Sequence, residues 1–168
     1  MTASIEFLLI RRTAQSKGGN PKQPPGGVPK FTGPDIQMVA SCVRHLPAYY
    51  AAVAKIEGDE LAAVRLLEVA QIVSDAEWRG NDRNHDTRHT LAELDRVAEV
   101  AVIKFLTPCD DQGKPRTEEW AARYVRVAWE TWKRNYKHHQ HYIEQRLDDF
   151  YRSAMGDVDD FTREEAAS

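Results

Sequence analysis

Cysteine is scarce in this chain of 168 residues, which has only Cys42 and Cys109. Neither belongs to a CxxC pair or to a cysteine–histidine ligand spacing, so we expect no disulfide framework and two free thiols in a reducing cytoplasm. Long apolar runs are also missing. The opening segment, residues 1–12, has a short apolar stretch without a basic start or a cleavage-site pattern, which predicts neither a secretory signal nor a membrane span. These absences favour a cytoplasmic protein.

Signatures of catalysis are missing as well. The sequence has no glycine-rich phosphate loop, no nucleophile elbow and no paired acidic motif. We therefore predict no catalytic residue and no cofactor. His85 and His89 have the i, i+4 spacing of helical metal ligands, but Asp86 stands between them where the zinc-protease pattern has a glutamate, and we expect no resident metal. His139 falls on an apolar stripe, which is typical of a core histidine.

Glycine and proline are absent from Glu118–Tyr151, so this segment is predicted to form one long helix. At 1.5 Å per residue such a helix would span about 50 Å. Thr117 is the expected N-cap, with acidic residues following it at the positive end of the helix dipole. The apolar stripe of this helix comprises Ala122, Val125, Trp129, Trp132, Tyr136, His139, Ile143, Leu147 and Phe150.

Three further helical segments precede it. The first starts near Pro34, and Pro47 is expected to kink or break it. Gly58 separates it from a second helix, residues 60–79, which is apolar on most of its circumference and is therefore predicted to be central. The first stripe comprises Ile36, Val39, Val43, Leu46, Tyr50 and Val53, and the third helix has Leu91, Leu94, Ala98, Ala101 and Phe105 on one stripe.

These segments predict an all-α fold, a bundle of about four helices with a long C-terminal helix over residues 34–154. Residues 1–33 read as a strand or arm followed by a linker rich in glycine, proline and lysine, which we expect to be extended, flexible and basic. Residues 155–168 are predicted to form an acidic, frayed tail.

Charge of the two signs is segregated along the chain, although the net charge is only −3. Residues 1–34 carry +4 and residues 35–113 carry −6. Residues 114–146 carry +4 again, and residues 147–168 carry −5. A basic zone inside an acidic protein is the electrostatic footprint expected of a surface that binds a polyanion.

Arg123, Arg126, Lys133 and Lys137 of the predicted long helix lie at offsets of 3, 7 and 4, which would place these four on one face able to follow phosphates along a strand, and Arg134 lies beside them. Tyr124 and Tyr142 are candidates for stacking on bases. The alternative is a solvated face whose lysines pair with Glu130 and Glu144. The candidate binding residues are Arg123, Arg126, Lys133, Arg134 and Lys137, with Arg79, Arg83 and Arg88 as a second patch.

An arginine and a polar residue followed by a histidine occur twice, at Arg83–His89 and at Arg134–His139. This spacing resembles the motif of HEPN-type ribonucleases, which are small helical bundles. Histidine can move the proton of a 2′-hydroxyl, and arginine can stabilise charge on the phosphate. A ribonuclease or toxin using Arg83 and His89 is thus one alternative, and a polar helix cap is another.

Four segments together resemble the CasB-type small subunits of CRISPR effector complexes, over residues 34–152. They are HLPAYYAAV at His45–Val53, TRHTLAELDRV at Thr87–Val97, EEWAARYVRVAWETW at Glu118–Trp132 and RLDDFYR at Arg146–Arg152. The resemblance implies a non-enzymatic subunit that contacts guide RNA and target strand, binds other subunits of the complex and associates side by side with its own copies. A further alternative is a structural phage or secretion-apparatus protein whose basic stripe is a protein interface.

Overall fold

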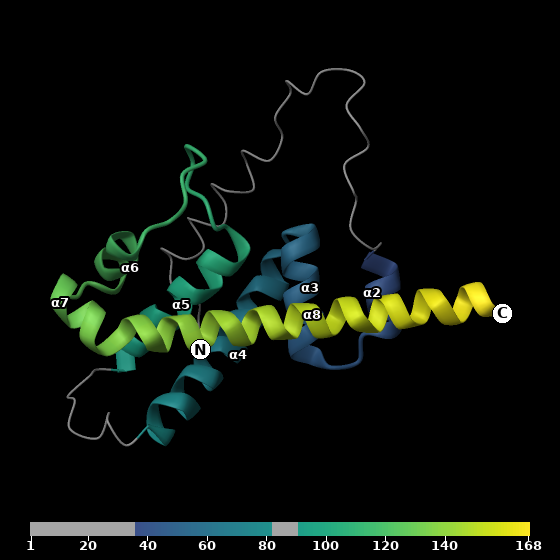
Figure 1. The fold of residues 1–168 in the computed structure, drawn as a ribbon, viewed down its shortest axis with the longest axis horizontal. Coiled ribbons are helices and arrows are strands. Elements are labelled where there is room, and N and C mark those ends of the chain that lie inside the picture. The colour runs from purple at the N-terminus through teal and green to yellow at the C-terminus, as the bar shows by residue number, and fades with distance from the viewer. Residues whose placement is uncertain (1–35, 82–90) are drawn as a thin grey trace.

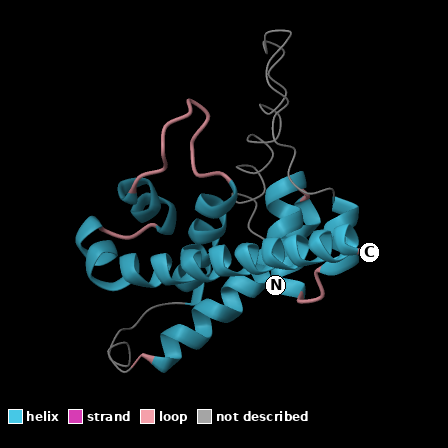
Figure 2. Cartoon of the chain, turned by 45° about the vertical axis from the view of Figure 1, so that its right-hand side comes forward, coloured by secondary structure: helices cyan, strands magenta, loops and turns pink. Residues whose placement is uncertain are grey.

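The computed structural model describes residues 36–81 and 91–168, and in this part of the chain the only β pairing is an isolated bridge between Cys109 and Pro115. Figure 1 and Figure 2 show a bundle of helices crossed by one long C-terminal helix. The predicted all-α fold is therefore confirmed. The elements are α2 (Ile36–Cys42), α3 (Leu46–Glu57), α4 (Glu60–Gly80), α5 (Leu91–Leu106), α6 (Glu118–Val125), α7 (Trp129–Thr131), the π-helical turn η2 (Trp132–Tyr136) and α8 (Lys137–Ala167).

Helix α5 is the most deeply buried element of the bundle. Every residue from Val97 to Ile103 is buried, and α5 packs against α4, α6 and α8. The prediction that residues 60–79 form the central helix is wrong, although the bounds of α4 agree with it. Leu61 and Ile72 on α4 are 66% and 65% exposed, because only one face of α4 meets its neighbours.

The predicted break near Pro47 is confirmed. Helix α2 ends at Cys42, and Pro47 lies in the first turn of α3, where its missing N–H is not needed. Leu46 was expected on the core stripe but is 59% exposed, because the stripe assumed an unbroken helix. Gly58 ends α3 with a left-handed φ of 66°, and the carboxylate of Asp59 accepts the N–H of Ala62 at 2.7 Å to begin α4.

The predicted single helix over Glu118–Tyr151 is wrong, since α6 ends at Val125. Arg126 adopts φ 65°, and the N–H of Val127 donates to the Ala122 carbonyl at 3.1 Å, a left-handed C-terminal cap. The Nε of Arg96, on α5, donates to the Val125 carbonyl at 3.1 Å. The break is thus stabilised by a tertiary contact, with no glycine or proline at the site.

Helix α8 runs along the whole bundle and contacts α2, α3, α4 and α5 (Figure 1). The long C-terminal helix is confirmed, but the frayed tail at residues 155–168 is wrong. Val158 is buried, and Thr162 Oγ1 lies 3.7 Å from Met38 Sδ, so packing against α2 carries the helix to Ala167. The predicted segment 1–33 lies outside the described residues.

Both cysteines are free, as predicted. None of the described helices combines the length and the apolar composition needed to cross a membrane.

Candidate nucleic-acid interface

The five basic residues predicted from the long helix lie within one stretch of chain, but on different elements. Arg123 is on α6 and Arg126 caps it; Lys133 and Arg134 are on the π-helical turn η2, and Lys137 opens α8. The single helical face inferred from their spacing is therefore wrong, because the chain turns at Arg126. Instead they are distributed over α6, η2 and the start of α8, the elements at the end of the bundle where the chain turns from α6 into α8 (Figure 1). We call these five residues the basic cluster.

Most of the basic cluster is exposed and not neutralised by acids. Arg123 and Arg134 are exposed and Lys137 is half-buried, and no carboxylate among the described residues lies within ion-pair distance of these three. Lys133 has the partner expected from a solvated helix, with its Nζ 2.8 Å from Glu130 Oε1. The cluster therefore has cationic groups available for an external anion.

The two tyrosines proposed to stack on bases differ in exposure. Tyr124 is buried, and its hydroxyl donates to Glu99 Oε2 at 2.6 Å, so the stacking prediction is wrong for this residue. Tyr142 is 37% exposed. Trp129, predicted as a core residue, is 38% exposed, and the ammonium of Lys133 lies 5.4 Å from its ring centre. The exposed ring of Trp129 thus lies beside the basic cluster. Its place on the apolar stripe had predicted a core position instead.

Of the second predicted patch, Arg79 lies in the described part of the chain. Arg79 is exposed on the last turn of α4, with its Nε 3.1 Å from Asp75 Oδ1. Arg83 and Arg88 lie outside the described residues, as do His85 and His89. The proposed ribonuclease pair of Arg83 and His89 therefore remains a prediction.

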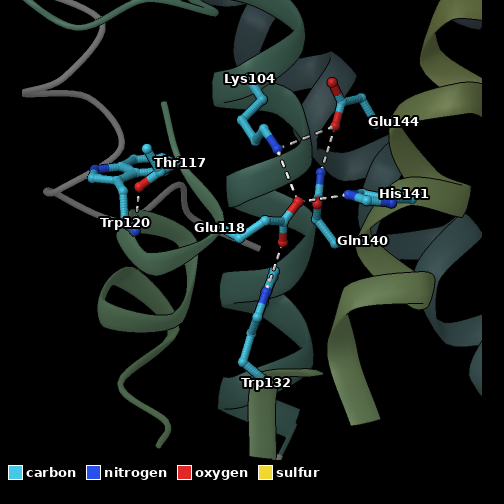
Figure 3. A network of polar contacts seen from close by, with 8 residues as sticks. All are labelled: Lys104, Thr117, Glu118, Trp120, Trp132, Gln140, His141 and Glu144. Atoms are coloured by element: carbon cyan, nitrogen blue, oxygen red, sulfur yellow. Dashed lines mark hydrogen bonds and ion pairs between the residues drawn. The ribbon is translucent and has the colours of Figure 1, made fainter. Parts of the chain in front are cut away.

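A polar network centred on Glu118 holds the reversal together (Figure 3). The Glu118 carboxylate on α6 accepts the indole N–H of Trp132 at 2.8 Å and lies 2.7 Å from His141 Nε2. Lys104 Nζ, from α5, is 3.7 Å away and also lies 4.0 Å from Glu144. The side chain of Glu118 thus links α6 to η2, α8 and α5, and α6, η2 and α8 are the elements that carry the basic cluster.

The same contacts govern the ionisation of Glu118. Burial acts to raise the pKa of its carboxyl. The hydrogen bonds from Trp132 and His141, with the charge of Lys104, outweigh burial and hold that pKa below its ordinary value. Glu118 is therefore a carboxylate at neutral pH.

The histidines of α8 serve different purposes. His139 is buried, as predicted, with Nε2 2.8 Å from Ser74 Oγ and its ring edge-on to Trp78 at 5.1 Å. Burial lowers the pKa of His139 to about 4, so the ring is neutral. His138 is exposed, while His141 joins the Glu118 network. Within residues 36–81 and 91–168, no group of three histidine, cysteine, aspartate or glutamate side chains is arranged to hold a metal ion.

Comparison with models of protein families, with curated proteins and with solved structures found no match to this chain.

Proposed function

We propose that this chain is a non-enzymatic helical subunit that binds the sugar–phosphate backbone of nucleic acid within a ribonucleoprotein of the CRISPR-effector type. In that complex it would contact guide RNA and target strand. The observation that carries the proposal is the basic cluster, in which Arg123, Arg134 and Lys137 have no acidic partner in the described part of the chain.

The chemistry of the cluster suits a backbone more than a base edge. Arginine and lysine side chains on successive short elements neutralise successive phosphates, and such contacts are independent of sequence. The exposed ring of Trp129 offers a face on which a splayed base can stack, which is also tolerant of sequence. Together they favour single-stranded or unwound nucleic acid over a duplex read by its base edges.

The contacts that hold α6, η2 and α8 together support the same proposal. Arg96 caps the last turn of α6, and Glu118 joins α6 to η2 and α8. A site held in this way loses little conformational entropy on binding. Because the net charge is −3, the basic surface is confined, which leaves other surfaces for neighbouring subunits or for copies side by side.

The test is fluorescence anisotropy with a labelled single-stranded RNA of mixed sequence, using the full chain and the double variant Arg123→Glu/Arg134→Glu. Each phosphate contact on a single strand adds about 0.7 to the slope of log affinity against log salt. We expect the double variant to bind on the order of tenfold more weakly at moderate salt and to lose about 1.4 of that slope.

The matched control is Arg44→Glu/Arg163→Glu, which makes the same charge change at exposed positions. Arg44 lies between α2 and α3, and Arg163 lies in the last turns of α8, at the opposite end of the bundle from α6 and α7 (Figure 1). Equal binding by both double variants would assign the effect to overall charge and exclude this site. No binding by the wild type, with nuclease-insensitive assembly onto a protein neighbour, would favour the structural-protein alternative.

A further inference from the structure

A cleft of about 350 Å³ opens between α4 and α5, with a lining distinct from the basic cluster. This volume lies within the range of sites that hold small molecules. Its apolar wall includes Ile72, Ala76 and Leu94. Ile72 is 65% exposed, so an aliphatic group lying in the cleft would cover apolar surface that now faces water.

Gln71 lines this cleft and has an unmet hydrogen-bonding requirement. The residue is 7% exposed, and its Oε1 has no hydrogen-bond partner among the described residues. A buried acceptor left without a donor costs about 1–3 kcal/mol. Because the terminal torsion of glutamine is soft, a small rotation can turn this oxygen toward a donor in the cleft.

The carboxylate of Asp95, on the α5 wall of the cleft, also lacks a hydrogen-bond donor among the described residues. Burial raises the pKa of Asp95, and the negative charge of Asp75 on α4 raises it further, against the opposing charge of Arg96. The like charge of Asp75 thus acts on Asp95 even though Asp75 is paired with Arg79, and a cation beside Asp95 would relieve this repulsion.

We propose that the α4–α5 cleft binds a small aliphatic amine or guanidine, whose cationic head donates to Asp95 and Gln71 and whose stem packs against Ile72 and Leu94. Among the described residues the cleft lining is rich in acceptors, and the arginine in that lining, Arg79, is paired with Asp75 at 3.1 Å. Anions are therefore disfavoured as ligands of this cleft. A neutral alcohol as long as the amine lacks the positive charge that would pair with the Asp95 carboxylate. This ligand class could be a free amine or the side chain of a lysine or arginine from a partner.

The test is a titration of the full chain with n-butylammonium, followed by the backbone amide NMR signals, with 1-butanol as the neutral match. We expect saturable shifts over residues 71–79 and 94–96 with the amine and not with the alcohol. Asp95→Asn should weaken binding about tenfold, which corresponds to about 1.4 kcal/mol. Glu119→Gln makes the same charge change at an exposed position on α6 and should leave the affinity unchanged.

Gln71→Leu removes the unpaired acceptor at similar side-chain volume, and we expect it to bind the amine several-fold more weakly. This variant is the alternative test if Asp95→Asn does not fold. A parallel titration with N-acetyl-lysine methylamide separates the sources: tighter binding than butylammonium points to a lysine of a partner, and weaker binding points to a free amine. Absence of saturable shifts, equal shifts with 1-butanol, or unchanged affinity in the folded variants would overturn the proposal.

Discussion

Replacing Glu118 by alanine should destabilise the fold far more than the same change at its neighbour Glu119. Both residues lie in the first turn of α6, so both variants lose the same favourable interaction with the helix dipole, about 0.3–1 kcal/mol. Only Glu118 also serves the polar network of Figure 3. The difference between the two variants therefore isolates the network.

The magnitude follows from what each partner loses. Trp132 has no exposed surface, and without Glu118 its indole N–H is a buried donor with no acceptor, at a cost of about 1–3 kcal/mol. The contact with His141 is partly exposed and adds about 1 kcal/mol. Lys104 keeps Glu144 nearby, so its loss adds little. We expect about 2–4 kcal/mol for Glu118→Ala and under about 1 kcal/mol for Glu119→Ala.

The assay is urea unfolding at pH 7 followed by circular dichroism, with thermal melting as a second measure. For a domain of this size 1 kcal/mol corresponds to about 2–4 °C, so the loss of about 2–4 kcal/mol expected for Glu118→Ala should lower Tm by roughly 4–16 °C. Glu118→Gln retains an acceptor for Trp132 and should lie between the two alanine variants. If Glu118→Ala and Glu119→Ala lose the same stability within about 0.5 kcal/mol, the network does not hold the reversal.

Three further changes test other parts of the structure. Because burial lowers the pKa of His139 from 6.5 to about 4, the unfolded chain takes up a proton in this pH interval before the folded chain does. The free energy of unfolding should therefore fall by about 3 kcal/mol as the pH drops from 6.5 to 4. Urea unfolding across this range should show that His139→Gln abolishes this fall and that His138→Gln retains it. Arg126→Gly should be about 0.5–1 kcal/mol more stable than Arg126→Ala, because only the alanine variant keeps a Cβ at φ 65°; equal melting curves would contradict this. Thr117→Ala should cost about 1 kcal/mol in urea unfolding, because the hydroxyl that accepts the Trp120 N–H at 3.1 Å is lost, while an unchanged midpoint would exclude a capping role.

Features determined by neighbouring residues were predictable from the sequence. The helical class, the break at Pro47 and the cap at Thr117 each depend on residues within one turn of chain. The burial of His139 followed from its position on an apolar stripe at helical spacing. In each case the sequence signal and the stabilising contact lie in the same segment, so periodicity and capping chemistry were sufficient.

Features determined by distant residues were not predictable. The end of α6 depends on Arg96, 29 residues earlier, and Tyr124 is withdrawn from solvent by Glu99, 25 residues earlier. The helical extension of α8 past Val158 depends on packing against α2, which local acidic composition does not reveal. The exposure of Arg123 and Arg134 agrees with the sequence prediction, whereas the division of the basic residues over α6, η2 and α8 could not be predicted from local charge.

We propose that this chain belongs to a nucleic-acid-binding assembly. The most direct measurement is to purify the full chain expressed together with the products of its neighbouring genes, treat the sample with nuclease, and determine the size of any protected nucleic acid. We predict co-elution with other subunits and a protected RNA of uniform length, lost when Arg123 and Arg134 are both replaced by glutamate. A monomer or homodimer free of nucleic acid would contradict the proposed function.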